Sequence, residues 1–274
     1  MNVLPLILYA AAGIAYAVHF ARRQPQAGRL ATTLLILAAL THTFVIGMQT
    51  MEVRHVPFAN PSRAVSTFVW LLALSYLYLE ITTDERAMGV FIMPMLIGLQ
   101  TIPAASPGVE RIDPVLDSPW FWVHVSSLLF AYASCALAGV LGLTYVVQFK
   151  EIKKKHLGYF YTRLPSLQTL DVMNSRAVAI GWLFLTIGVT VGVIWTSQAR
   201  VTAPDDPNLQ AMSLNDPKIF VALLTWAVYS FAMLARRTLG WSGRRAAWLS
   251  ALGFAIVLLN FLPINYFVTT SHTF

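Results

Sequence analysis

Long runs of apolar residues, broken by short polar stretches, extend along the whole chain. Eight of these runs approach or reach the roughly 17–25 residues that a helix needs to cross a bilayer. They lie at Val3–Ala21, Leu30–Met48, Ala64–Ile81, Ala87–Pro103, Trp120–Phe149, Ala177–Trp195, Ile219–Leu234 and Ala246–Phe267. We therefore predict an all-α fold: a polytopic membrane helix bundle of about eight transmembrane helices, forming a single integral membrane domain over residues 1–274.

The ends of several runs carry further signals. The fourth run is interrupted by Pro94 and Pro103, and the fifth is long enough to project beyond the bilayer on its lysine-rich side. We expect the sixth helix to end at Trp195 and a polar loop to follow, with Pro217 in the first turn of the next helix. The first run lacks the basic segment that precedes a cleavable signal sequence, so we expect it to remain as a helix.

Composition supports the membrane class. The chain is 57% hydrophobic and only 11% charged, which leaves too little polar surface to cover a soluble globule of this size. A net charge of +7 would suggest nucleic acid in a soluble protein, but here the basic residues lie in short loops, so the expected surroundings are a lipid bilayer and no nucleic acid. The single cysteine, Cys135, excludes an internal disulfide and covalent haem attachment, and we expect it to pack as a small hydrophobe.

The loops on the two sides of the membrane differ in their number of basic residues. Fourteen of the nineteen basic residues fall in one set of alternate loops and five in the other. Because cytoplasmic loops carry the excess of Lys and Arg, we predict that both termini are extracytoplasmic, together with the loops around residues 49–63, 104–119 and 196–218. The predicted location is the bacterial plasma (inner) membrane, with multiple passes.

Two histidines are predicted to share this outer face. His124 stands at the head of the fifth run, just behind Trp120 and Trp122, and His272 follows the last run. The loop that separates Trp195 from Trp226 lies on the same side, and we interpret it as the floor of a ligand site.

Other polar residues have competing interpretations. His42 lies inside the second run, where an ionisable side chain is costly unless it has a partner or a function, and both interpretations stay open. Glu80 and the 84–86 segment end the third run, and we expect them to form a solvated cap at the inner face.

Haem is the ligand that suits two outer histidines with apolar and aromatic walls. Its iron accepts neutral imidazoles from both sides, its ring favours apolar contact, and its propionates favour Arg or Lys. A zinc site would require a third or fourth ligand, most naturally close in sequence, and no such cluster accompanies the two histidines.

Several motifs occur in the order that is typical of one membrane family. They are Leu164–Asp171, Gly192–Trp195, Asp216–Lys218, Trp226–Tyr229, Gly240–Trp248 and Gly253–Phe254, preceded by Trp122–Val125, Ala131–Tyr132 and His42 with Pro57 and Asn60. With these motifs, nearly the whole chain resembles the cytochrome c assembly protein family, in its haem-handling branch of the CcsA and HemX type.

This resemblance implies that His124 and His272 are the axial ligands of a non-covalent, bis-histidine haem b beside a tryptophan-rich loop. The matched motifs also contain further candidate haem-binding residues: Trp195, Asp216, Lys218 and Trp226. We add His42, and we add Arg200 because it lies in the same loop and could pair with the propionates in place of Lys218. The loop departs from the family pattern, because it lacks the run of tryptophans and has Ile219 where the family has an acidic residue after the lysine.

Three functions follow from these observations. The first is a haem-binding protein that handles or delivers haem on the extracytoplasmic side during cytochrome c maturation, with haem and a second cytochrome c biogenesis membrane protein as partners. The alternative is a HemX-type membrane regulator of tetrapyrrole biosynthesis. A small-solute transporter ranks last, because the chain has no evident internal repeat. We expect no autonomous catalytic activity.

Overall fold

The computed structural model describes residues 1–53, 60–106, 118–155, 158, 161–202 and 217–261, and within these ranges all regular secondary structure is helical. The helices are α1 (Val3–Arg22), α2 (Pro25–Val53), α3 (Pro61–Thr83), α4 (Gly89–Ala105), α5 (Pro119–Lys153), α6 (Leu167–Thr202), α8 (Pro217–Thr238) and α9 (Arg244–Phe261). Among the described residues, six helices are long and apolar enough to cross a membrane, and α4 is a shorter apolar helix. The predicted polytopic helix bundle is confirmed.

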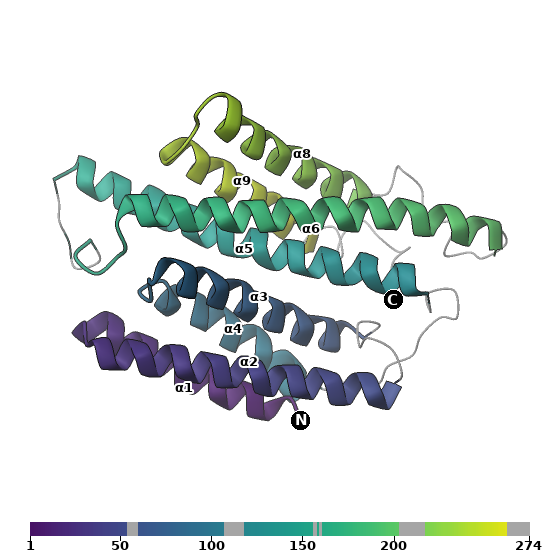
Figure 1. Cartoon of the computed structure of the whole chain (residues 1–274), viewed down its shortest axis with the longest axis horizontal. Coiled ribbons are helices and arrows are strands. Elements are labelled where there is room, and N and C mark those ends of the chain that lie inside the picture. The colour runs from purple at the N-terminus through teal and green to yellow at the C-terminus, as the bar shows by residue number, and fades with distance from the viewer. Residues whose placement is uncertain (54–59, 107–117, 156–157, 159–160, 203–216, 262–274) are drawn as a thin grey trace.

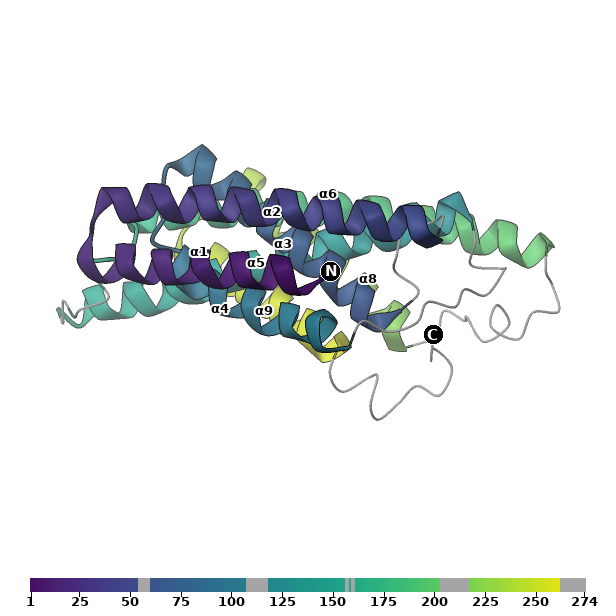
Figure 2. The same cartoon turned by 90° about the horizontal axis from the view of Figure 1, so that it is seen from below.

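The helices lie roughly along one common axis (Figures 1 and 2). Helices α1 to α4 pack together as one group, and α5, α6, α8 and α9 pack as another, with α3 joining the groups through contacts with α5 and α6. The turns between α1 and α2, α3 and α4, and α8 and α9 lie at the same end as the C-terminus of α5 (Figure 1). We call this the basic end, because the basic-rich set of loops lies there, and we call the other end the opposite end.

Proline begins four of the helices, at Pro25, Pro61, Pro119 and Pro217. Proline suits this position because its missing N–H would have no helical partner there and its φ is already helical. Asn60 caps α3, with its side-chain oxygen accepting a hydrogen bond of 2.8 Å from the Ser62 N–H. The predicted start of a helix at Pro217 is confirmed.

The predicted bounds of the sixth helix were wrong at both ends. Helix α6 begins ten residues before Ala177 and continues seven residues past Trp195. Hydropathy identifies only the apolar part of a helix. Polar residues can extend the helix where the fold provides partners for their hydrogen-bonding groups. Asn174, for example, is buried in the first part of α6 and donates a hydrogen bond of 2.9 Å to the Ala138 carbonyl of α5.

Large aromatic side chains fill the interior, and each fully buried tyrosine has a partner for its hydroxyl group. The Tyr9 hydroxyl contacts His42, that of Tyr16 donates to Glu80, and that of Tyr229 donates to the Cys135 carbonyl. Cys135 itself is buried, as expected of a small packed residue. The outward faces carry many exposed large hydrophobic side chains, such as Phe44, Val193 and Leu234, which is the surface that lipid requires.

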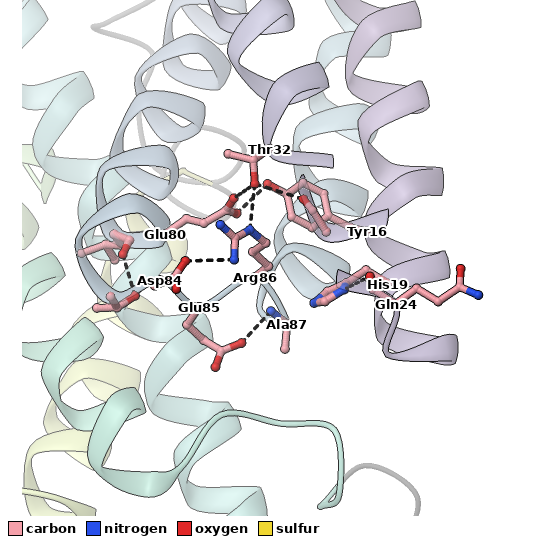
Figure 3. A network of polar contacts seen from close by, with 12 residues as sticks. Tyr16, His19, Gln24, Thr32, Glu80, Asp84, Glu85, Arg86 and Ala87 are labelled. Carbon is pink, nitrogen blue, oxygen red and sulfur yellow. Dashed lines mark hydrogen bonds and ion pairs between the residues drawn. The ribbon is translucent and has the colours of Figure 1, made fainter. Parts of the chain in front are cut away.

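Glu80 is not part of a solvated cap, and that expectation was wrong. Its side chain is 1% exposed and accepts hydrogen bonds of 2.5 Å from the hydroxyls of Tyr16 and Thr32 (Figure 3). Arg86 closes this network, donating from Nε to Thr32 and pairing with the exposed Asp84. A buried carboxylate needs such donors, and they come from α1 and α2, far from Glu80 in sequence.

Candidate functional site

His124 lies in the second turn of α5, at the opposite end of the bundle from the basic loops. Its ring is partly buried, and Nδ1 lies 2.7 Å from the carbonyl oxygen of Gly188 on α6. A carbonyl can only accept a hydrogen bond, so Nδ1 carries the proton and donates it. In the neutral ring Nε2 is then unprotonated, with a lone pair available for a metal.

Gly192 of α6 allows the ring to come this close. Gly188, Gly192 and Trp195 follow one stripe of the helix at i, i+4 and i+7. A Cβ added at Gly192 would lie only 2.5 Å from both Nδ1 and Cε1 of His124. Residue 192 must therefore lack a side chain for the imidazole to reach the Gly188 carbonyl.

Aromatic rings surround the histidine. The Trp195 ring is 5% exposed and lies nearly parallel to the His124 ring, with the ring centroids 6.5 Å apart. Phe121 packs against both Trp122 and Trp195, with centroid distances of 5.2 Å in each case. The structure therefore brings together His124 and Trp195, two of the predicted site residues, in an apolar and aromatic setting.

The remaining predicted residues of the outer loops are only partly described. His272 and Asp216 lie outside the described residues. Arg200 belongs to the last turns of α6 and Lys218 to the first turn of α8, both at the opposite end, and their side chains lie outside what the structure describes.

Trp226 does not join the His124 group. Its indole Nε1 donates a hydrogen bond of 3.0 Å to Thr186 Oγ1, and its side chain is 37% exposed. Thr186 is two residues from Gly188, which corresponds to about 200° around an α-helix. Trp226 is thus held against a different face of α6 from the one that contacts His124.

His42 forms a separate cluster in the N-terminal group of helices. Its ring is fully buried, with Nδ1 3.1 Å from the Tyr9 hydroxyl and Nε2 2.8 Å from the Ser66 hydroxyl. Each hydroxyl can donate or accept, so both nitrogens of a neutral imidazole are satisfied. This arrangement leaves no nitrogen of His42 free to bind a metal.

A cavity of about 210 Å³ lies between the two groups of helices. Thr67, adjacent to Ser66, lines one side of it, and Ser126 and Ser127, within one turn of His124, line the other. The rest of the lining is apolar or aromatic and includes Trp70 and Phe130.

Sequence reasoning missed the residues that position the two histidines. Gly188 and Gly192 form a Gly-x-x-x-Gly pattern, which is typical of closely packed membrane helices and could have indicated a close contact on α6. Tyr9 and Ser66 carry no comparable signal, because their roles depend on which helices are neighbours.

The known proteins to which this chain is similar carry related names. A family model described as cytochrome C assembly protein matches residues 2–272. A protein of Guillardia theta named cytochrome c biogenesis protein CcsA is 29% identical over 259 residues, covering 87% of this chain and 83% of the relative. Proteins of the same name from Synechococcus elongatus and Microcystis aeruginosa are 24% and 25% identical, each covering 89% of this chain and 87% of the relative.

Proposed function

This chain belongs to the cytochrome c assembly protein family, and on that premise we propose that it binds haem on the extracytoplasmic side of the membrane. It is a multi-pass membrane protein with a role in cytochrome c maturation. Beyond this role, we propose where haem binds, which residues ligate its iron, and that the haem is of type b.

The observation that carries the proposal is the hydrogen bond from His124 Nδ1 to the Gly188 carbonyl. It selects the tautomer whose Nε2 can ligate iron, and such a bond also increases the basicity of the ligating nitrogen. None of the described residues hydrogen-bonds to Nε2. Metal-ligating histidines commonly have a backbone carbonyl or carboxylate on their second nitrogen, so His124 has the surroundings of a ligand.

We assign the second axial position to His272. Helix α9 runs from the basic end toward the opposite end, which is the end that carries His124 (Figure 1). Trp195 supplies apolar wall, and Arg200 and Lys218 are the cations that we assign to the haem propionates. We propose that Asp216 caps α8 and that Trp226, which is held by Thr186, makes no direct contact with the haem.

Bound haem b would supply an iron centre. His124 and His272 would hold it through neutral imidazoles, and iron ligated by two protein side chains suits carriage of haem better than catalysis by it. We therefore propose haem handling or delivery, with a second membrane protein of cytochrome c biogenesis as partner and a bacterial plasma membrane as the location. The three relatives described above are named for cytochrome c biogenesis, not for tetrapyrrole regulation or solute transport.

The test is the visible spectrum of the purified protein after reconstitution with haem b. We expect the bands of a six-coordinate, low-spin haem in the wild type. His124→Ala and His272→Ala should each give a five-coordinate spectrum or an empty site, and added imidazole should restore the six-coordinate form.

His19 offers a matched control. It lies at the basic end, where its Nδ1 is 2.9 Å from the Gln24 carbonyl, so His19→Ala removes a histidine from the other side of the membrane. The proposed ligation fails if both ligand variants and their double variant keep the wild-type spectrum and haem content.

A further inference from the structure

The turn between α8 and α9 lies at the basic end of the bundle (Figure 1). Residues of this turn line an open pocket of about 590 Å³, whereas His124, near the start of α5, lies at the opposite end. We call this pocket the arginine–tryptophan pocket, and its lining is Gly240, Trp241, Ser242, Arg244, Arg245 and Trp248. These residues belong to one of the family motifs, but the proposed haem site makes no use of them.

A carboxylate of α6 holds the turn in place. Asp171 accepts hydrogen bonds from Arg236 at 2.8 and 3.1 Å and from the Gly243 N–H at 2.9 Å. Gly240 and Gly243 have φ angles of +63° and +59°, which glycine adopts without strain. The pocket is thus formed by a fixed turn, and the charge of Asp171 is already neutralised by Arg236.

The two arginines of the pocket have no such carboxylate partner. In the part of the chain that the structure describes, neither Arg244 nor Arg245 forms an ion pair, and both are exposed. The Arg245 guanidinium lies over the Trp241 ring at 5.3 Å, and that of Arg244 lies over Phe149 at 5.5 Å. Stacking engages the flat face of a guanidinium, which leaves N–H groups at its edge able to bind an anion.

Aromatic and apolar residues continue from the pocket along the helices. Trp248 is 46% exposed beneath the Lys150 ammonium group, which lies 5.8 Å from its ring, and Leu252, one turn further along α9, is 52% exposed. Tryptophan beside Lys and Arg is typical of the level of lipid headgroups. An anion bound by the arginines could therefore carry an acyl chain along Trp248 and Leu252.

We propose that the arginine–tryptophan pocket binds the phosphate headgroup of an anionic phospholipid in the leaflet at the basic end. The arginines bind the phosphodiester oxygens, Trp241 and Trp248 lie at the depth of the headgroup, and Leu252 contacts an acyl chain. Among the residues that the structure describes, the lining contains no His, Cys or Met that could ligate iron, which distinguishes this site from the haem site.

Native mass spectrometry of the purified full-length protein tests this, with dioleoyl phosphatidylglycerol and dioleoyl phosphatidylcholine as probes. We expect the wild type to retain phosphatidylglycerol in preference to phosphatidylcholine. The double variant R244Q/R245Q should bind phosphatidylglycerol about thirtyfold more weakly. The variant R22Q/R23Q removes two basic residues from the same end without touching the pocket, and it should bind as the wild type does.

Ser242→Glu provides a second test that keeps both arginines. The new carboxylate would occupy the pocket and repel phosphate, so phosphatidylglycerol binding should fall while the melting temperature stays the same. The proposal is overturned if R244Q/R245Q or Ser242→Glu retains wild-type binding, or if R22Q/R23Q loses as much. Complete displacement of the lipid by millimolar inorganic phosphate would also overturn it, because the site would then be one for soluble phosphate.

Discussion

Asp171 of α6 and Arg236 of α8 form a two-point ion pair, in which each carboxylate oxygen accepts from a different guanidinium nitrogen. The two residues are 65 positions apart in sequence, and both side chains are at least two-thirds buried. Their pairing joins two helices and, through the Gly243 N–H, the turn that follows α8. The Asp171 carboxylate thus joins two motifs that are distant in sequence, Leu164–Asp171 and Gly240–Trp248.

Asp171→Asn should destabilise the protein. The variant loses the charge that pairs with Arg236, and we expect the free energy of unfolding to fall by about 1–3 kcal/mol. Asp84→Asn is the matched control, because Asp84 is 84% exposed in its pair with Arg86 and such surface pairs contribute about 1 kcal/mol or less. Melting temperatures of both variants in detergent would measure the difference, and equal losses would contradict the structural role of Asp171.

Gly192→Ala should weaken haem binding without removing a ligand. The added Cβ would lie 2.5 Å from the His124 ring, so the ring must move away from the Gly188 carbonyl. Loss of such an orienting bond typically lowers affinity about 10–100-fold, and haem titration would measure it. Gly98→Ala serves as control, since its added Cβ has no neighbour within 4 Å. If both variants bind haem as the wild type does, the contact between His124 and α6 has no part in haem binding.

His42→Ala should affect stability and leave the haem spectrum unchanged. The substitution leaves the buried hydroxyls of Tyr9 and Ser66 without their shared partner, at a cost of about 1–3 kcal/mol in the free energy of unfolding. Ser66→Ala, which removes one of the two bonds, should give a smaller loss. A changed haem content or band position in His42→Ala would identify His42 as a ligand after all.

Reporter fusions should locate the two ends of the bundle. A reporter that is active only in the periplasm should be active when it is fused after Phe274. A reporter that is active only in the cytoplasm should be active when it is inserted after Lys154, close to the end of α5. A reversed fusion after Lys154 would place His124 on the cytoplasmic side, and a reversed fusion after Phe274 would place His272 there. Either result would remove the basis of the proposed extracytoplasmic haem site.

The sequence by itself determined the class and outline of this protein. Apolar runs predicted the eight helices of the described part of the chain, because burial in lipid requires a long apolar segment wherever a helix crosses the membrane. Pro217 correctly predicted the start of a helix, because the preference of proline for the first turn depends only on the local backbone. The family was also recognisable, since its motifs are short and local.

Only the tertiary structure decided what the polar residues contact. Glu80 has its donors on α1 and α2, His42 is satisfied by Tyr9 and Ser66, and His124 is oriented by Gly188. Each of these partners lies 24 to 64 residues away in sequence. Hydropathy records how much a residue favours lipid or water, but a buried polar group is stable through a specific partner, and that partner depends on which helices pack together.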